Sequence, residues 1–193
     1  HLVRLHGAIG IGSPLKPPIT FKDTEPVLEK AFRKGIAAVA ISLNSPGGSA
    51  VQSSLIHARI RELADEFKLP VYVFCEDVAA SGGYWLACAG DEIYADESSI
   101  VGSIGVISAG FGFVAAIDKL GIERRVHTAG ESKSILDPFK PEKPEDVARL
   151  LAMQESVHDA FKALVRSRRA GKLKGEDQDL FSGAFWSGAK ARD

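Results

Sequence analysis

Apolar runs with strand character alternate along the chain with stretches in which apolar residues recur at helical spacing. Strands are predicted where short runs are rich in β-branched or aromatic residues, at residues 2–5, 36–43, 70–75 and 92–95. Helices are predicted between them, at residues 25–34, 51–67 and 84–89, with Pro26 placed in the first turn of its helix. This alternation predicts an α/β fold with a parallel-rich sheet flanked by helices, and a site at the carboxyl ends of its strands.

The C-terminal half of the chain continues the pattern with longer helical stretches. Strands are predicted at residues 104–108 and 123–127, a short helix at 114–120, and a long helix at 144–170. One face of the long helix carries Val147, Leu150, Leu151, Val157, Phe161, Leu164 and Val165. Its arginines, Arg166, Arg168 and Arg169, indicate a solvent-exposed face and partners of the dipole at the C-terminal end of the helix, and not a binding patch. Near the N-terminus, the Gly- and Pro-rich residues 7–18 predict a mobile flap beside the substrate.

Ser81 lies in a Ser-Gly-Gly turn between a predicted strand and a predicted helix. Such a turn exposes the hydroxyl, lets a substrate backbone approach and directs helix N-terminal N–H groups at the site, as an activated nucleophile requires. A helix N-cap is the alternative, since serine is favoured there for its own hydrogen bond. The sequence around Ser81 alone leaves both interpretations open.

A second glycine-rich turn follows the preceding predicted strand, in the run Asn44-Ser45-Pro46-Gly47-Gly48-Ser49. Backbone N–H groups left unpaired in such a turn are the material of an oxyanion hole, although Pro-Gly is also common in ordinary tight turns. Two glycine-rich turns in consecutive β-α units, one of them carrying a serine, indicate a catalytic site more specifically than either turn alone.

The serine also needs a base, and the histidines are not well placed to supply it. His1 and His6 accompany the first strand, and His57 and His158 lie within helical patterns, which leaves His127. Lys133, in the loop after the strand predicted at 123–127, is the better candidate. A lysine acts as a base only when desolvation or a positive field lowers its pKa well below about 10.4. Lys119 is a rival, beside an acid at a predicted helix end.

Four motifs occur in an order that resembles the signal peptide peptidase A family. They are Asn44-Ser45-Pro46-Gly47-Gly48, Ala80-Ser81-Gly82-Gly83-Tyr84, Val101-Gly102-Ser103-Ile104-Gly105-Val106 and Ser132-Lys133-Ser134, and the run from Leu180 to Ala191 resembles the family's C-terminal signature. The resemblance implies a Clp protease/crotonase-like fold of repeated β-β-α and β-α units, and a serine endopeptidase with a Ser-Lys dyad. It implies Ser81 as the nucleophile, Lys133 as the general base, Gly48 as an oxyanion donor and Ser103 as a hydrogen-bond partner of the lysine. Gly82, which follows the nucleophile, is expected to supply the second oxyanion N–H.

Composition narrows the function further. The 193 residues, 45% of them hydrophobic, are enough for one core, and a net charge of −1 argues against a nucleic-acid partner. Cys75 and Cys88 lack metal-ligand spacing and are expected in the core. We expect a peptide substrate and neither a cofactor nor a metal. An acyl-CoA enzyme or a non-catalytic assembly module on the same fold are the alternatives.

The resemblance and the abrupt ends of the chain carry three expectations about the whole protein. Residues 1–193 are expected to form a single peptidase domain that lacks segments at both ends, because strand-like sequence begins at once and the closing signature breaks off. A homo-oligomeric ring, such as an octamer, is expected from the family. Association with the bacterial inner membrane through an upstream segment is expected as well, with a soluble cytoplasmic protein as the alternative.

Overall fold

The computed structural model describes residues 1–10, 12–13, 17–130 and 132–192. It has two compact units, His1–Gly105 with His158–Asp193, and Val106–Val157, and each is described by itself. Part of the flap predicted at residues 7–18, namely residue 11 and residues 14–16, lies outside the described residues.

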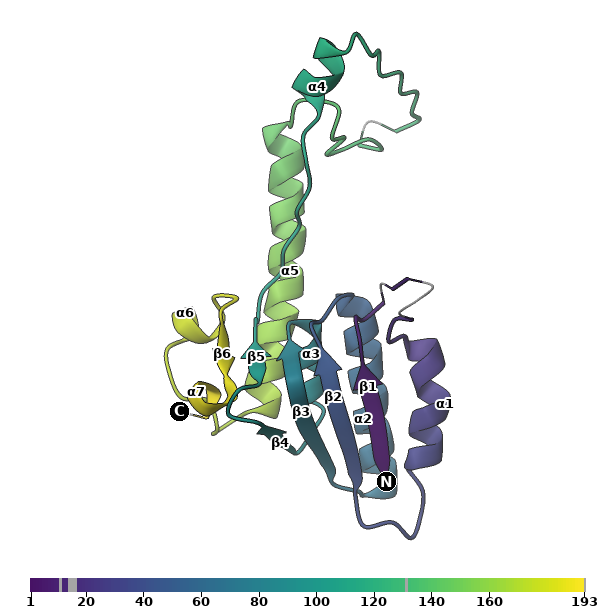
Figure 1. Ribbon diagram of the computed structural model, residues 1–193, viewed down its shortest axis with the longest axis vertical. Helices are drawn as coiled ribbons and strands as arrows, with labels where there is room; N and C mark the ends of the chain where they lie inside the picture. Colours follow the sequence, from purple (N-terminus) through teal and green to yellow (C-terminus); the bar gives the residue numbers. More distant parts are fainter. Residues whose placement is uncertain (11, 14–16, 131, 193) are drawn as a thin grey trace. The chain divides into compact units, whose positions relative to one another are not determined.

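The first unit is built on one mostly parallel sheet (Figure 1). Its strands are β1 (Leu2–His6), β2 (Val39–Ser45), β3 (Val71–Ala80), β4 (Glu92–Ala95), β5 (Ile100–Gly102) and β6 (Phe185–Ser187). They follow the order β1-β2-β3-β5-β6, with β4 also paired to β3. Every described pairing is parallel except that of β5 with β6. The predicted α/β class with a parallel-rich sheet is therefore confirmed.

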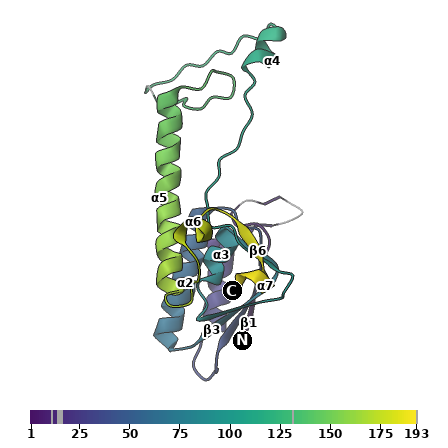
Figure 2. The same ribbon diagram turned by 90° about the vertical axis from the view of Figure 1, so that its left-hand side faces the viewer.

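Three helices cover one face of this sheet, α1 (Phe21–Ala31), α2 (Ala50–Phe67) and α3 (Gly82–Ala87) (Figures 1 and 2). The side chain of Thr20 accepts a hydrogen bond from Asp23 N at the start of α1, and Ser49 accepts one from Gln52 N at the start of α2. Because Thr20 starts α1 four residues earlier than predicted, Pro26 lies in the second turn of the helix, and its predicted place in the first turn is wrong.

The core lies between the sheet and these helices. Alternate residues of β1 and of the first half of β3 are buried against it, as in a sheet covered on one face. On the other face, Phe74 stacks on Tyr94 with ring centroids 5.1 Å apart, and both rings are partly exposed. A second apolar cluster contains Trp85, Cys88, Ile104, Phe161, Val165 and Phe181. It packs the C-terminal part of α5 (Pro144–Arg168) against α3 and the residues beside α6 (Asp177–Leu180).

The second unit contains α4 (Val114–Lys119) and the first part of α5. Neither of the strands predicted at residues 104–108 and 123–127 is formed, so both predictions are wrong. Both segments have strand-like sequence, but a strand needs a hydrogen-bonded neighbour, and the described residues provide none for either. Large apolar residues of the second unit are highly exposed, with exposed fractions of 87% at Ile107 and 82% at Phe111.

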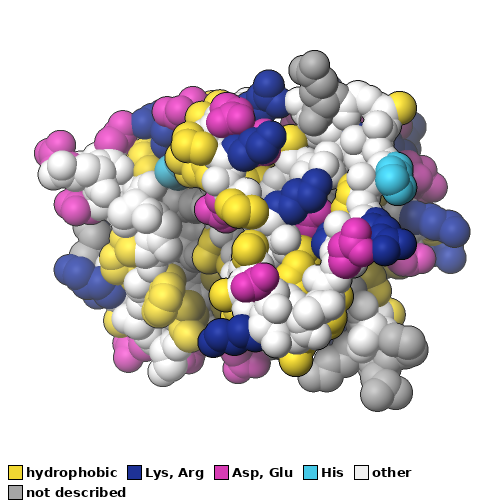
Figure 3. Space-filling view, turned by 90° about the horizontal axis from the view of Figure 1, so that it is seen from above, with side chains coloured by type: hydrophobic (Ala, Val, Ile, Leu, Met, Phe, Trp, Pro, Cys, Tyr) yellow, Lys and Arg dark blue, Asp and Glu magenta, His cyan; other side chains and the backbone are white. Residues whose placement is uncertain are grey.

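The predicted apolar face of the long helix is confirmed only near its C-terminus. Phe161 and Val165 are buried, whereas Leu151 in the second unit is 57% exposed. Within the described ranges, no helix is both long enough and apolar enough to cross a membrane. Acidic and basic side chains are interspersed over the face shown in Figure 3, in line with a net charge of −1.

Cys75, Cys88 and His57 are titratable side chains of the first unit that are buried. Both cysteines are buried, as predicted, and burial raises the pKa of Cys75 and of Cys88 to about 12, so that each stays a neutral thiol. Burial lowers the pKa of His57 to about 4, since the charged imidazole would lose its hydration there. The two cysteines therefore belong to the apolar clusters of the core, and His57 is a buried neutral residue near Arg61 and Arg168.

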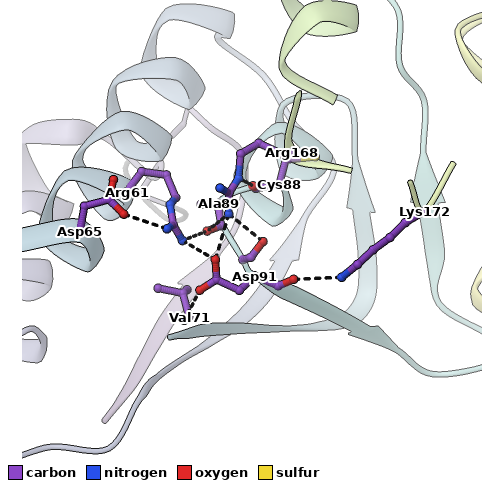
Figure 4. Close-up of polar contacts among 9 residues, drawn as sticks. Arg61, Asp65, Val71, Cys88, Ala89, Asp91, Arg168 and Lys172 are labelled. Carbon is purple, nitrogen blue, oxygen red and sulfur yellow. Dashed lines mark hydrogen bonds and ion pairs between the residues drawn. The ribbon is translucent and has the colours of Figure 1, made fainter. Parts of the chain in front are cut away.

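A cluster of ionic hydrogen bonds around Asp91 holds the C-terminal end of α3 (Figure 4). Arg168 Nε donates to Cys88 O at 2.9 Å, and its Nη2 donates to Gly90 O and to Asp91 Oδ1, both at 3.2 Å. Arg61 of α2 also donates to Asp91 Oδ1, at 3.0 Å. The other carboxylate oxygen accepts from Val71 N at 2.8 Å, which connects the cluster to the start of β3. Arg168 is thus a tertiary anchor, and its predicted solvent-exposed role is wrong.

Replacing Arg168 by alanine is expected to lower the free energy of unfolding by roughly 2–3 kcal/mol, because carbonyl groups at the end of α3 and Asp91 lose a charged donor. Urea denaturation of the purified protein measures this change. The control is Arg125→Ala, which removes an exposed ion pair with Glu123 and should cost less than about 1 kcal/mol. Equal effects of the two substitutions would show that Arg168 is not an anchor.

Candidate active site

Two glycine-rich turns meet at the carboxyl ends of β2 and β3. These strands are parallel neighbours, so the turn after Ser45 and the turn at Ser81 emerge at the same edge of the sheet. Gly47 lies directly against the second turn. A Cβ on Gly47 would be 2.9 Å from the Cβ of Ser81 and 2.8 Å from Gly82 N, so a residue with a side chain could not occupy this position without displacing the serine.

Ser81 has a backbone conformation that is rare for a residue with a side chain, with φ 54° and ψ −122°. Ser81 occupies the N-cap position of α3, but its side chain makes no capping hydrogen bond to the helix, so the hydrogen bond for which serine is favoured at an N-cap is absent. Hydrogen bonds fix the backbone on both sides, from Ser81 N to Gly102 O at 2.9 Å and from Trp85 N to Ser81 O at 3.0 Å. Conformations of this kind typically cost about 1–3 kcal/mol and persist where the surrounding structure enforces them.

Two backbone N–H groups lie close to this serine. A Cβ on Gly82 would be 3.4 Å from Gly48 N, which places the two turns in contact at these residues. Within the described part of the chain, the N–H of Gly48 and that of Gly82 donate to no other group. Gly48 has a φ of 143°. Two hydrogen bonds with Ile9 hold the residues on either side of it, because Ile9 N donates to Gly47 O and Ser49 N donates to Ile9 O. Unpaired N–H groups so placed can stabilise a negatively charged oxygen.

Ser103 belongs to the same unit and lies one residue beyond Gly102, whose carbonyl accepts from Ser81 N. It also has a positive φ, 54°, and its N–H donates to Ala184 O at 2.7 Å. The structure thus brings the backbones of Ser103, Ser81, Gly82 and Gly48 into one region of the first unit.

Lys133 lies in the second unit, in a succession of turns after Gly130, and its side chain is exposed on that unit. Its backbone N–H donates to Gly130 O at 3.2 Å. The rival bases Lys119 and His127 are exposed residues of the same unit. The pairing of Lys133 with Ser81 and with Ser103 stays a prediction.

The loop that carries Lys133 is fixed at its end by the buried carboxylate of Asp137. Arg124 donates to both carboxylate oxygens, with distances of 3.1–3.2 Å, and Phe139 N donates to Oδ1 at 3.0 Å. The Phe139 N–H and the Arg124 guanidinium lower the pKa of this carboxyl group, which stays ionised. Arg124 also lies over the Phe139 ring, 4.9 Å from its centroid. Sequence reasoning missed this anchor, because the two charged residues are separated by a loop and show no helical or strand spacing.

The described residues contain no group of three or more His, Cys, Asp or Glu side chains that could hold a metal ion. The chemistry available in the first unit is that of a serine hydroxyl and of backbone N–H donors. This arrangement suits attack on a carbonyl carbon, in which negative charge develops on the carbonyl oxygen.

Comparison with known proteins identifies the family. The family model described as peptidase family S49 matches residues 64–193. "Serine protease SPPA, chloroplastic" from Arabidopsis thaliana is 31% identical over 199 residues, which cover 98% of this chain and 28% of that protein. "Protease 4" from Haemophilus influenzae is 35% identical over 171 residues, covering 86% of this chain and 26% of that protein.

A further relative carries a different name. A Brucella melitensis protein named "Na(+)/H(+) antiporter NhaA" is 59% identical over 192 residues, which cover 98% of this chain and 26% of that protein. The chain thus spans about a quarter of the length of these relatives, and the antiporter name refers to a protein of which three quarters lies outside the match. The family match covers both the Ser81 turn and the Lys133 loop, and the predicted resemblance to signal peptide peptidase A is confirmed. The chain belongs to peptidase family S49.

Proposed function

We propose that this chain is the catalytic part of a serine endopeptidase that cleaves peptide bonds through an acyl-enzyme on Ser81. The observation that carries the proposal is the close packing of the Gly47–Gly48 turn against Ser81 and Gly82, with a serine side chain that does not cap its helix. The name of an Enterococcus faecium relative, "Putative signal peptide peptidase SppA", 29% identical over 161 residues, supports signal peptides or unfolded membrane-derived polypeptides as the substrate class.

In the proposed reaction, Ser81 Oγ attacks the scissile carbonyl carbon and transfers its proton to the neutral amine of Lys133. The carbonyl oxygen becomes negatively charged and accepts hydrogen bonds from Gly48 N and Gly82 N. Each such donor typically contributes about 2.7–4 kcal/mol of transition-state stabilisation. The protonated lysine then gives its proton to the leaving amine, and a water molecule activated by the same lysine hydrolyses the ester.

The proposed reaction also gives Ser103 a role and sets a requirement on Lys133. Ser103 accepts a hydrogen bond from the Lys133 ammonium and orients it. Lys133 must be neutral to accept a proton, and it is exposed on its own unit, so the proposal requires that packing in the working enzyme desolvate it.

An acyl-CoA enzyme of the crotonase type is the alternative on this fold, and a non-catalytic assembly module is another. An acyl-CoA enzyme would use the N–H groups of Gly48 and Gly82 and would not need the serine hydroxyl. The match to a peptidase family and the enforced conformation of Ser81 favour the peptidase. Covalent labelling of Ser81 by a fluorophosphonate would distinguish a nucleophilic serine from both alternatives.

Replacing Ser81 by alanine is expected to lower peptide hydrolysis by roughly a thousandfold or more, because the nucleophile is lost. Turnover of an unfolded fluorogenic polypeptide measures the effect, and circular dichroism checks the fold. The control is Ser54→Ala, an exposed position on α2, which should keep full activity. Wild-type turnover by the Ser81 variant would end the proposal.

Lys133→Arg is expected to be as inactive as Lys133→Ala, because a guanidinium stays charged and cannot accept the serine proton. The wild-type rate should rise with pH as the lysine loses its proton, and a pH–rate profile measures this rise. Lys119→Arg is the matched control in the same unit and should keep the wild-type profile. If the Lys119 variant lost activity and the Lys133 variants kept it, the base would be assigned wrongly.

We also propose that the working form is a homo-oligomeric ring, such as an octamer. The supporting observation is the exposure of large apolar side chains in the second unit, at Ile107, Phe111 and Leu120. Association with a membrane, through a segment beyond this chain, remains part of the proposal.

Substituting serine at both Ile107 and Phe111 is expected to shift the protein to smaller species and to lower activity in parallel. Multi-angle light scattering of the full-length protein measures the mass. A wild-type protein that is monomeric at micromolar concentration and fully active would contradict the ring.

A further inference from the structure

Strand β3 contains a bulge immediately before it reaches the Ser81 turn. Leu43 of β2 pairs with Cys75, but the next pair is Ser45 with Ala79. Residues 76–78 of β3 therefore face the single residue Asn44 of β2. A bulge interrupts the ladder of backbone hydrogen bonds and re-aims the strand that follows, so the direction of the Ser81 turn depends on how this bulge is held.

The side chain of Asn44 bonds to β3 where the ladder of backbone hydrogen bonds is interrupted. Its Oδ1 accepts a hydrogen bond from Val78 N at 3.2 Å, and its Nδ2 donates to Asp77 Oδ2 at 2.7 Å. From the other side, the buried hydroxyl of Ser99 donates to Glu76 O at 2.6 Å. The backbone of the bulge is thus hydrogen-bonded to side chains on both sides.

The neighbouring polar groups brace the same bulge from β1 and β2. Ser42 Oγ donates to Glu76 Oε1 at 2.5 Å, and His6 Nε2 lies 2.7 Å from Ser42 Oγ. These contacts hold the Glu76 side chain, whereas Asn44 bonds directly to the backbone of the bulge at Val78, just before the ladder resumes with Ser45 and Ala79.

Asn44 therefore links the two strands just before they reach the turns that carry Gly48 and Ser81 in the proposed function. Along β2 it precedes Gly48 by four residues, and along β3 its partner Val78 precedes Ser81 by three. We propose that Asn44 is a positioning residue, whose side-chain amide sets the register of the Gly48 N–H relative to the Ser81 hydroxyl. This inference rests on the proposed function and adds to it a residue that touches neither substrate nor the reacting atoms.

A positioning role and a purely structural role have different consequences. A purely structural residue changes the unfolding midpoint and affects activity only through the folded fraction. A positioning residue changes kcat and the affinity for a peptide aldehyde, whose adduct resembles the tetrahedral intermediate, and leaves KM nearly unchanged. Small displacements of an oxyanion donor are sufficient for such an effect.

The Asn44–Asp77 pair allows a reciprocal exchange as the test. Asn44→Asp keeps an acceptor for Val78 N but places two carboxylates where a donor and an acceptor now lie 2.7 Å apart. Asp77→Asn keeps a hydrogen-bonding partner for Asn44 and serves as the matched single control. The double variant, Asn44→Asp with Asp77→Asn, restores the pair with donor and acceptor exchanged.

We expect Asn44→Asp to lower kcat and the aldehyde affinity by about tenfold or more, with KM within about twofold of wild type. Asp77→Asn should stay within about threefold of wild-type kcat, and the double variant should return to that range. Steady-state kinetics and aldehyde inhibition are measured on full-length protein at one fixed pH for all variants, with thermal unfolding measured in parallel.

Three results would overturn the inference in an enzyme whose wild type is active. They are an unchanged kcat in Asn44→Asp, a loss that the double variant does not recover although it is folded, and a loss that follows the unfolding midpoint alone. A wild-type protein that neither cleaves peptides nor reacts with a fluorophosphonate would instead refute the proposed function, and the role of Asn44 with it.

Discussion

The close approach of two backbone turns at the carboxyl edge of the sheet is the constraint on which the rest of the first unit depends. Ser81 and Gly82 lie so near Gly47 that no side chain fits between the turns, and the serine takes a conformation that residues with side chains rarely adopt. Such an arrangement persists only when both strands that lead into it are fixed in register. The parallel pairing of β2 with β3 and the hydrogen-bonded bulge at residues 76–78 provide that register.

The same requirement explains why α3 is held at both ends. At its N-terminus, Ser81 N donates to Gly102 O of β5, and Trp85 N in the first turn of α3 donates to Ser81 O. At its C-terminus, Arg168 and Arg61 bind the last carbonyl groups and Asp91, and Asp91 also accepts from β3. A short helix has little stability of its own, so these contacts, with the apolar cluster around Trp85, keep the serine in place.

The sequence predicts the parts of this structure that depend on local pattern. β-branched runs mark β2 and β3, and glycine-rich sequences mark the turns at Gly48 and Ser81, because those signals act within a few residues. Prediction from sequence fails where the residues that a segment contacts lie far from it along the chain. Residues 104–108 and 123–127 have strand composition but no hydrogen-bonded neighbour among the described residues. Arg168 has the sequence position of a solvent-exposed residue, and its partners at the end of α3 are visible only in the folded structure. The pairing of Asn44 with Val78 likewise depends on a register that neither segment encodes alone.

We propose that Ser81, Gly48 and Gly82 form one site for acyl transfer, and a crystal structure of the full-length protein with a peptide aldehyde tests this most directly. We expect a covalent bond from Ser81 Oγ to the aldehyde carbon, with the resulting oxygen about 2.7–3.1 Å from Gly48 N and Gly82 N. An adduct whose oxygen points away from both N–H groups, or an aldehyde bound at another residue, would contradict it.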